Sequence, residues 1–237
     1  MPELSVLDGA TIAFDLDGTL VDSAPDLVGT LNLILTQERL PLLPFDTARS
    51  FIGHGARRML EQGFAAQGLT PTAEQMDGLF ARFLAHYEQH STDLTRPFPG
   101  VAEALAELKA RGARLTVCTN KITPLSRPIL EALDLARYFD AIVGADLSPA
   151  RKPDPRHLAT AVELAGGRLD RTIMVGDAAP DAGCAKACGA PLVLVSFGYT
   201  DIPVTELGAD ILIDHYDQLI EACETLLTAC EPRTTGL

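Results

Sequence analysis

The stretch Thr11-Ile12-Ala13-Phe14-Asp15-Leu16-Asp17-Gly18-Thr19-Leu20 places two carboxylates directly after an apolar run of the kind that forms a buried strand. Asp15 and Asp17 are two residues apart, and side chains at positions i and i+2 lie on one side of an extended chain. Two like charges about 4 Å apart repel by roughly 4 kcal/mol at an effective dielectric constant near 20. Such a pair needs a compensating cation or a chemical use. We therefore interpret it as a site for a hard metal ion, with a carboxylate available as nucleophile.

The composition of the chain restricts its class. The 237 residues are 47% hydrophobic, enough for one large α/β domain or one domain with an insertion. The formal net charge of −13 argues against nucleic acid or an anionic membrane surface as partner, because phosphate backbones require dense lysine and arginine. A small anionic substrate stays compatible with this charge, because a binding site is a local field. No apolar run is long enough to cross a membrane.

Two further features predict a cytoplasmic location. The N-terminal residues Met1-Pro2-Glu3-Leu4 lack the basic and apolar regions of a signal peptide. The five cysteines form an odd set without the spacing of a zinc ribbon, and we interpret them as free thiols in a reducing compartment.

Short apolar runs of strand type alternate with helical patterns along the chain. The runs span residues 11–14, 115–118, 141–143, 172–175, 192–196 and 211–213. The helical patterns between them span residues 101–111, 124–135, 155–165 and 180–188. Alternation of this kind is typical of an α/β fold with a doubly wound, Rossmann-like parallel sheet.

One connection in this pattern is too long for a single crossover. The first strand ends near Asp15 and the next clear strand begins near Leu115, whereas a βαβ unit needs about 30 residues. The surplus is helical in pattern, so we predict an inserted α-helical cap domain over the carboxyl edge of the sheet. The cap domain would comprise residues 23–92 and the core domain residues 1–22 and 93–237, with hinges near 21–24 and 94–99. Ser23, at the first hinge, is suited to cap the helix that follows.

Polar groups follow four of the predicted strands. They are, in chain order, Asp15 and Asp17, then Thr119 and Asn120, then Lys152, and last Asp177 with Asp181. Each alone is more typical of a helix cap, a turn or a solvated surface. Because ligands of open α/β sheets bind at the carboxyl ends of the strands, the whole set predicts one site.

The charges of this set indicate its chemistry. Four carboxylates around one pocket would leave no place for a phosphate dianion without cations, which Mg²⁺ and Lys152 would supply. Aspartate has a reference pKa near 3.9, so Asp15 would be ionised at pH 7 and could attack phosphorus without a base. Asp17 is suited to protonate the leaving alcohol and then to activate water.

With these residues in place, the chain resembles a haloacid dehalogenase superfamily phosphatase of the phosphoglycolate phosphatase type. The matching segments run in order from about Thr11 to His215. They are residues 14–23, 97–101, 117–121, 152–155, 175–181 and 197–199.

The resemblance implies a reaction and two catalytic carboxylates. Asp15 would be the nucleophile and a Mg²⁺ ligand. Asp17 would be the general acid and base, and its backbone carbonyl would bind the metal. The reaction would be Mg²⁺-dependent hydrolysis of a small phosphomonoester through an aspartyl-phosphate at Asp15, with 2-phosphoglycolate as the best candidate substrate. The predicted cap resembles the helical cap of this family, which closes over the site and excludes water.

The resemblance also assigns the other polar residues. Thr119 and the backbone at Asn120 would hold phosphoryl oxygens, and Lys152 would bind the phosphate and orient Asp15. Asp177 would be the third protein ligand of the metal, and Asp181 would support it from behind or through water. Many relatives carry serine where Ala178 stands here. Because both acids remain, we expect the activity to be retained.

A glycine-rich stretch in the predicted cap is the candidate for substrate recognition. Gly53-His54-Gly55 is followed by Arg57, and glycines permit close backbone approach to a ligand. The same stretch is equally typical of a turn between helices with a solvated basic start. In the functional interpretation, Arg57 is suited to a substrate carboxylate.

Other functions stay open from the sequence. Phosphosugar mutases of the β-phosphoglucomutase type share the first motif but usually carry cap histidine and lysine residues near it. Residues 24–31 hold neither, which favours transfer to water. Pyrophosphate, nucleotides and sugar phosphates remain possible substrates, because fold and motif do not choose among them. We expect a small phosphorylated metabolite as partner and a monomer or homodimer.

Overall fold

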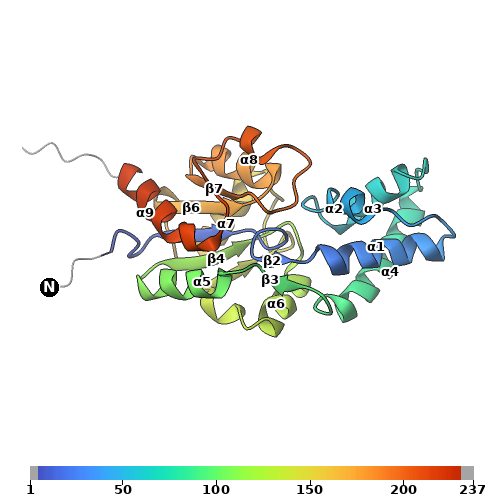
Figure 1. Cartoon of the computed structure of the whole chain (residues 1–237), viewed down its shortest axis with the longest axis horizontal. Coiled ribbons are helices and arrows are strands. Elements are labelled where there is room, and N and C mark those ends of the chain that lie inside the picture. Colours follow the sequence, from blue (N-terminus) through green and yellow to red (C-terminus); the bar gives the residue numbers. More distant parts are fainter. Residues whose placement is uncertain (1–4, 231–237) are drawn as a thin grey trace, which may run out of the picture.

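The computed structural model describes residues 5–230, and within them six parallel strands form one sheet in the order β5-β4-β1-β6-β7-β8 (Figure 1). Residues 1–4 and 231–237 lie outside the described residues. The structure therefore does not bear on the predicted core at these positions or on the prediction made from the N-terminal residues. The strands are β1 (Thr11–Phe14), β4 (Arg114–Cys118), β5 (Ala141–Val143), β6 (Thr172–Gly176), β7 (Leu192–Val195) and β8 (Ile211–Ile213).

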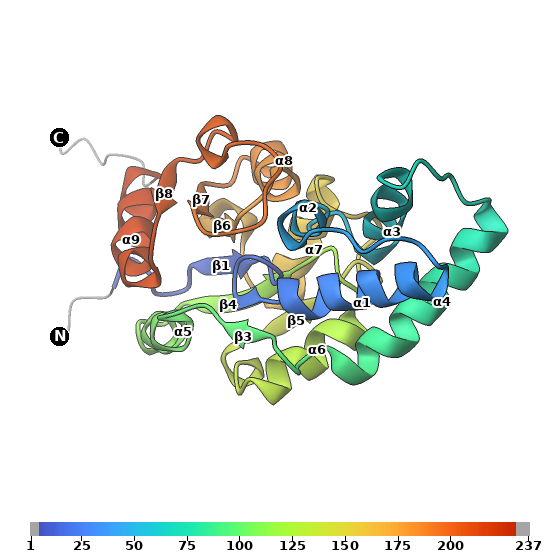
Figure 2. The ribbon, with the colours of Figure 1, turned by 45° about the vertical axis from the view of Figure 1, so that its right-hand side comes forward.

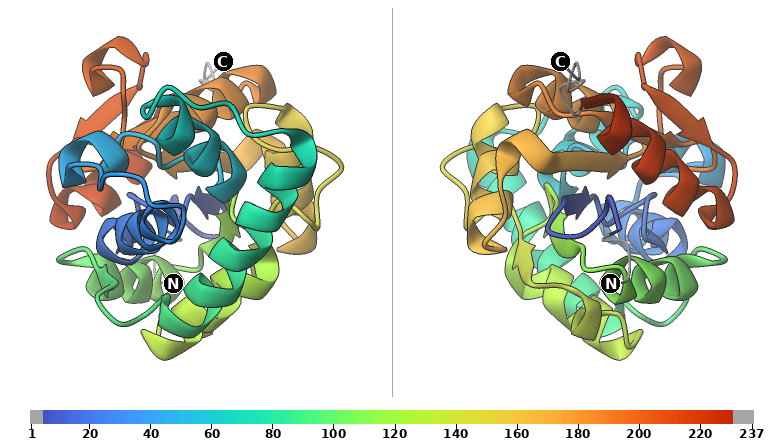
Figure 3. Two further views of the ribbon diagram at one scale, coloured as in Figure 1. Left: turned by 90° about the vertical axis from the view of Figure 1, so that its right-hand side faces the viewer. Right: turned by 90° about the vertical axis from the view of Figure 1, so that its left-hand side faces the viewer.

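Residues along the five strands from β5 to β7 in the sheet order alternate between two apolar cores, one on each face, whereas Leu212 of the edge strand β8 is exposed. Ile12 and Phe14 of β1 belong to one core, and Ala13 between them belongs to the other. Because both faces are covered, the strands are apolar throughout rather than alternately polar. The prediction of a doubly wound parallel sheet is therefore confirmed. One face carries α7 (Pro155–Leu164) and α8 (Ala179–Cys188), and the other carries α5 (Val101–Ala110), α6 (Thr123–Ala132) and α9 (Leu219–Cys230) (Figures 1 and 3).

Strand β1 lies where the winding of the sheet reverses. The chain runs from β1 to β4 and β5 on one side, and then returns to β6, β7 and β8 on the other. Open α/β sheets bind ligands outside the carboxyl ends of their strands at such a point. Phe14 pairs with Val117 of β4 and with Val175 of β6, so the loops after these three strands begin at one level.

Four helices lie together at the carboxyl ends of the strands (Figures 1 and 2). We call them the helical cap: α1 (Ala24–Gln37), α2 (Phe45–Arg49), α3 (Ala56–Ala65) and α4 (Ala73–His90). Helices α1 and α4 pack along each other, and Leu31 and Phe83 between them are fully buried. All four helices fall inside the range predicted for the cap domain.

The chain crosses between core and helical cap at two neighbouring strands. Strand β2 (Val21–Asp22) leads into α1, and β3 (Arg96–Pro97) returns antiparallel beside it. The buried carboxylate of Asp26 accepts hydrogen bonds from the backbone N–H of Leu94 at 3.0 Å and of Thr95 at 2.8 Å. The two predicted hinges thus lie side by side and are tied together.

Four short 3-10 turns complete the described chain. They are η1 (Ala136–Tyr138), η2 (Leu169–Arg171), η3 (Val204–Glu206) and η4 (Tyr216–Gln218). Of the helices in residues 5–230, none combines the length and the apolar character that a membrane crossing requires. The described cysteine side chains, Cys118, Cys184, Cys188 and Cys223, are free thiols.

Candidate functional site

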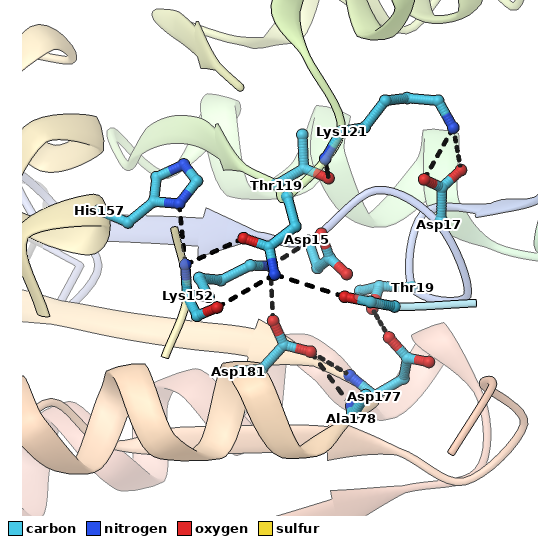
Figure 4. Close-up of polar contacts among 12 residues, drawn as sticks. Asp15, Asp17, Thr19, Thr119, Lys121, Lys152, His157, Asp177, Ala178 and Asp181 are labelled. Carbon is cyan, nitrogen blue, oxygen red and sulfur yellow. Dashed lines mark hydrogen bonds and ion pairs between the residues drawn. The ribbon is translucent and has the colours of Figure 1, made fainter. Parts of the chain in front are cut away.

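A buried lysine lies between two of the predicted carboxylates (Figure 4). Nζ of Lys152 is 2.8 Å from Oδ1 of Asp15 and 2.6 Å from Oδ1 of Asp181. Burial raises the pKa of Asp15 to about 6; Lys152 opposes this shift, whereas the charges of Asp181 and Asp17 add to it. Burial acts to lower the pKa of Lys152, but Asp15 and Asp181 outweigh it and raise that pKa. Lys152 is therefore a permanent cation beside Asp15.

Asp177 follows β6 and reaches the same group. Its Oδ1 accepts a hydrogen bond from Oγ1 of Thr19 at 2.9 Å, and its Oδ2 accepts one from the backbone N–H of Tyr199 at 2.6 Å. Burial, and then the charges of Asp181 and Asp15, raise the pKa of Asp177 well above its usual range. Gly18, with φ of 85°, packs directly against it, since a Cβ there would stand 2.5 Å from Oδ2 of Asp177.

Asp181 stands one turn into α8 and fills the place of a helix cap. Its Oδ2 accepts hydrogen bonds from the backbone N–H groups of Asp177 and Ala178, each at 3.1 Å. The contact with Ala178 is one half of a capping box, in which the side chain at N3 accepts from the backbone N–H of the cap residue. A serine hydroxyl at position 178 would accept from the N–H of N2 or N3, so its absence does not change the hydrogen bonds of these two N–H groups.

The oxygen atoms of Asp15, Asp177 and Asp181 fit a hard divalent cation. One oxygen of each lies within 4.8 Å of the others. Oδ1 of Asp15 is buried and accepts no hydrogen bond of normal geometry from any described residue, although Lys152 is close. The donors are all carboxylate oxygens, which suits Mg²⁺. Oδ1 of Asp181 is paired with the Lys152 ammonium and its Oδ2 accepts two backbone N–H groups, whereas each oxygen of Asp177 accepts one hydrogen bond from an uncharged donor. Asp177 and Asp15 are therefore better placed than Asp181 to bind a metal directly.

The side chain of Asp17 lies outside this group of three carboxylates. Its oxygens accept hydrogen bonds from Nζ of Lys121, at 2.7 and 2.8 Å, and from Oγ of Ser23, at 2.5 Å. The prediction that Ser23 caps helix α1 is wrong, because its hydroxyl is donated to the carboxylate instead. The metal contact predicted for the backbone carbonyl of Asp17 stays a prediction.

Lys121 is a site residue to which the sequence analysis gave no role. Its side chain is 7% exposed, and Nζ lies 4.8 Å from the ring centroid of Tyr87 on cap helix α4. Burial acts to lower the pKa of Lys121, but Asp17 and Tyr87 together outweigh burial and raise that pKa. Thr119 and Lys121 lie after the end of β4, where the alternation of an extended strand no longer fixes the side-chain direction, so the sequence held no signal for this contact.

The predicted phosphate holders follow β4. Oγ1 of Thr119 accepts a hydrogen bond from the backbone N–H of Lys121 at 3.2 Å. The amide of Asn120 binds the backbone of Lys152 on both sides, since Oδ1 accepts from its N–H at 2.9 Å and Nδ2 donates to its carbonyl at 3.2 Å. Nδ2 also donates to the carbonyl of Gly53 at 3.4 Å. The Asn120 side chain thus positions Lys152 and the cap loop, by which we mean residues 50–55 between α2 and α3.

His157 on α7 is a second residue that the sequence analysis missed. Its Nδ1 accepts a hydrogen bond from the backbone N–H of Lys152 at 3.3 Å, and its Nε2 lies 3.4 Å from the carbonyl oxygen of Val143. Burial, and then the charge of Lys152, lower the pKa of His157 to about 4. The ring is therefore neutral, with its proton on Nε2. A histidine within an amphipathic helix carries no sequence signal for this contact.

Core and helical cap enclose a pocket of about 60 Å³ at these residues. Asp15, Asp17, Thr119, Asn120 and Lys121 line it from the core. The cap supplies the predicted residues Gly53, Gly55 and Arg57 together with an apolar wall that includes Leu27, Met59, Phe80 and Phe83.

Two of the predicted cap residues do not present a free group to this pocket. His54 is exposed and is not among the lining residues. The guanidinium of Arg57 pairs with Asp77 at 2.7 Å and lies 3.9 Å from Glu61. Arg151, which directly precedes Lys152, also lines the pocket, and the sequence analysis missed it.

Comparison with known proteins gives consistent matches over the length of the chain. The model of the family described as haloacid dehalogenase-like hydrolase matches residues 12–195. A phosphoglycolate phosphatase of Caulobacter vibrioides is 55% identical over 237 residues, which is 100% of both chains. A phosphoglycolate phosphatase of Mesorhizobium japonicum is 45% identical over 219 residues, 92% of this chain and 96% of that one.

The fold has close structural counterparts as well. The crystal structure of a predicted phosphoglycolate phosphatase from Haemophilus somnus superposes with a TM-score of 0.85 at 28% identity, covering 91% of this chain and 98% of that one. A predicted phosphatase from Clostridium acetobutylicum superposes with a TM-score of 0.79 at 25% identity, covering 92% and 100%.

Proposed function

Since this chain belongs to the haloacid dehalogenase-like hydrolases and is a phosphatase, we propose that it hydrolyses 2-phosphoglycolate to glycolate and phosphate, with Mg²⁺, through an aspartyl-phosphate at Asp15. The observation that carries the proposal is the buried group of Asp15, Asp177 and Asp181, with Nζ of Lys152 2.8 Å from Oδ1 of Asp15. A nucleophile, metal-binding oxygens and a phosphate-binding cation thus stand together at one sheet edge.

Asp15 is the nucleophile in this proposal. A pKa of about 6 still leaves most of the carboxylate ionised at neutral pH. Lys152 holds one of its oxygens and offers a point charge to the phosphate. Asp15 and Asp177 would hold the Mg²⁺ ion, which when bound offsets the negative charge of the phosphoryl oxygens. Thr119 and the backbone N–H of Asn120 would orient those oxygens.

Asp17 moves the proton. As Asp15 forms its bond to phosphorus and the bond from phosphorus to the ester oxygen breaks, Asp17 donates a proton to that oxygen and glycolate leaves. Asp17 then accepts a proton from water, whose oxygen attacks the phosphorus of the aspartyl-phosphate. Inorganic phosphate is released and Asp15 is regenerated. The position of Asp17 in the pocket wall, held by Ser23 and Lys121, supports this role.

The size of the pocket supports a small substrate. About 60 Å³ is far below the roughly 300–1,000 Å³ of pockets that hold drug-sized ligands. The relatives named phosphoglycolate phosphatase, 55% and 45% identical to this chain, support 2-phosphoglycolate in particular. We further propose that this metabolite is the partner of a cytoplasmic monomer or homodimer that binds neither nucleic acid nor membrane, in keeping with the net charge of −13.

The test is phosphate release with Mg²⁺ from 2-phosphoglycolate, pyrophosphate, a nucleotide and a sugar phosphate. We expect the highest kcat/KM for 2-phosphoglycolate, and a loss of at least roughly 10³-fold in kcat for Asp15→Asn. Rapid quenching of the wild-type reaction should trap phosphate on Asp15. Full turnover by Asp15→Asn would overturn the mechanism, and a higher kcat/KM for another substrate would overturn the assignment to 2-phosphoglycolate.

A sugar 1-phosphate separates this proposal from a phosphosugar mutase. A mutase returns the phosphoryl group to the sugar and yields the 6-phosphate, whereas the proposed phosphatase yields inorganic phosphate. We expect inorganic phosphate alone, because residues 24–31 supply no histidine or lysine to protect the aspartyl-phosphate from water.

A further inference from the structure

Four cationic side chains line or adjoin the pocket, and three of them already bind carboxylates. Lys152 and Lys121 are held by carboxylates of the site itself. Arg57 is held by carboxylates on the surface of the helical cap. Arg151 lines the pocket, and its guanidinium forms no ion pair with an acidic side chain anywhere in residues 5–230. It is therefore the cation of this set whose charge is left for a ligand.

Arg151 lies where the cap loop meets the predicted phosphate site. A Cβ on Gly55 would stand 3.2 Å from Nη1 of Arg151 and 3.7 Å from the backbone oxygen of Asn120. Those two atoms are therefore no more than about 7 Å apart. Gly55 has φ of 90°, a conformation that favours glycine, and the absence of a side chain there keeps the space between them open. Arg151 is thus within the length of one small molecule of the Asn120 peptide.

We propose that Arg151 binds the carboxylate of the substrate and so selects phosphomonoesters that carry a carboxylate next to the ester carbon. The inference rests on the proposed function, in which the peptide of Asn120 holds the phosphate. In 2-phosphoglycolate a single methylene group separates the ester oxygen from the carboxylate, so the second anionic group must be bound close to the first. A guanidinium is suited to this, because it pairs with a carboxylate through two parallel hydrogen bonds.

The two other cations near the substrate are less suited to this role. Lys121 shares its protons with both oxygens of Asp17, so a substrate carboxylate would compete with the residue that moves the proton. Arg57 would have to leave Asp77, 2.7 Å away, before it could turn to a ligand. The carboxylate contact that the sequence suggested for Arg57 is therefore assigned to Arg151.

The test compares 2-phosphoglycolate with ethyl phosphate, which has a methyl group in place of the carboxylate. The measured quantity is the ratio of kcat/KM for the two substrates. We expect a wild-type ratio well above one, and a fall of about 30-fold in that ratio for Arg151→Ala, as for the loss of one partner of a charged pair. Arg151→Lys keeps the charge without the paired hydrogen bonds and should fall in between. The matched control is Arg58→Ala, since Arg58 is exposed and pairs with Glu61 at 2.9 Å.

The outcomes separate this inference from the proposed function. A wild-type ratio near one overturns the proposed substrate and the role of Arg151 with it. A high wild-type ratio that Arg151→Ala retains overturns the role of Arg151 alone. A ratio that falls for Arg57→Ala and not for Arg151→Ala would return the carboxylate contact to Arg57. Thermal unfolding of each variant shows that the comparison is made on folded protein.

Discussion

The ammonium group of Lys121 donates hydrogen bonds to both carboxylate oxygens of Asp17, at 2.7 and 2.8 Å. Lys121 also packs on the ring of Tyr87 from the helical cap, 4.8 Å from its centroid. The proposed proton carrier of the core is therefore held by a residue whose own position depends on the cap. The position of cap helix α4 and the placement of Asp17 are in this way linked through one side chain.

Replacement of Lys121 by methionine should lower kcat. Without the ammonium group, Asp17 loses two of its three hydrogen bonds and is no longer fixed toward the leaving oxygen. General acid catalysis contributes typically 10²–10⁴-fold, and we expect a loss of about 10- to 100-fold, because Ser23 still holds one oxygen. Steady-state kinetics on 2-phosphoglycolate measures it. Lys109→Met is the control, since it removes a surface pair with Asp140 at 2.9 Å. A folded Lys121→Met enzyme with wild-type kcat would contradict the role.

Divalent cations should stabilise the fold through Asp177. A ligand at 100 times its dissociation constant stabilises the folded state by about 2.7 kcal/mol. We expect Mg²⁺ to raise the melting temperature of the wild-type protein and a chelator to reverse the effect. In Asp177→Asn the Mg²⁺ effect should be largely lost.

A second prediction concerns the stability of Asp177→Asn in the absence of metal. The raised pKa of Asp177 means that its ionised form is disfavoured in the fold at neutral pH. An asparagine can keep both contacts without the charge, because its Oδ1 can accept from the N–H of Tyr199 while its Nδ2 donates to the hydroxyl oxygen of Thr19. In chelator, Asp177→Asn should therefore unfold at a temperature no lower than that of the wild type, and a large decrease would show that the carboxylate is needed for folding rather than for the cation.

The free energy of unfolding should decrease as the pH is lowered, because His157 is held neutral in the fold. Its pKa is lowered from 6.5 to about 4 in the fold, so the neutral ring contributes stability above pH 6.5 that is lost as the pH falls toward 4. Between pH 7.5 and 5.0 the expected loss is roughly 2 kcal/mol. His157→Gln should lack this part of the pH dependence in urea unfolding. Asp15 and Asp177, whose pKa values are raised, act in the opposite direction in both proteins and cancel in the comparison. An equal pH dependence of wild type and variant would refute the prediction.

Tyr199 joins Asp177, the predicted hinge at β2 and the helical cap. Its N–H donates to Asp177, its hydroxyl contacts Asp22 and accepts from the N–H of Ala24 at 3.1 Å, and Arg49 of α2 lies 4.8 Å from its ring centroid. Tyr199→Phe removes the hydroxyl alone. We expect a stability loss of about 1.5–3 kcal/mol, typical of a hydrogen bond to a charged group, and faster hydrogen exchange at the hinge.

The stabilisation of Tyr199→Phe by Mg²⁺ should stay as in the wild type, because the backbone contact with Asp177 remains. Arg49→Met offers the matched change on the cap side. It removes two hydrogen bonds to the carbonyls of Phe197 and Gly198 and should speed exchange in α2 without affecting the hinge. Loss of the Mg²⁺ effect in Tyr199→Phe would show that the hydroxyl, and not the N–H, supports the proposed metal site.

The sheet could be predicted from the sequence because its strands are buried on both faces and read as continuous apolar runs. Helix ends were less predictable. The pattern at 124–135 suggested a helix through Leu135, but α6 ends at Ala132. Asp134 adopts a left-handed φ of 57°, and the N–H of Leu135 turns back to the carbonyl of Leu130 at 2.8 Å. The sequence does not show whether Asp134 continues the helix or adopts the left-handed conformation that ends it.

The site was predictable to the extent that topology alone determines it. Asp15, Thr119 and Asp177 each follow a strand beside the point where the winding reverses, so their meeting could be inferred from chain order. The contacts of Lys121, His157 and Arg151 depend on side-chain direction after a loop, which no periodicity encodes. The choice between Arg57 and Arg151 required the position of Asp77, which lies 20 residues from Arg57 in the sequence.

Strands β2 and β3 are only two residues long, yet they place both ends of the helical cap side by side, with Asp22 opposite Arg96. An insertion whose ends adjoin can be removed or exchanged as a module, because the remaining chain has no gap to bridge. Access to the pocket is thus set by a stretch of the chain that is separable from the core, whereas Arg151 remains in the core beside Lys152. A core joined directly from Asp22 to Arg96 would be an open enzyme, accessible to phosphate groups on macromolecules that the present pocket excludes by size.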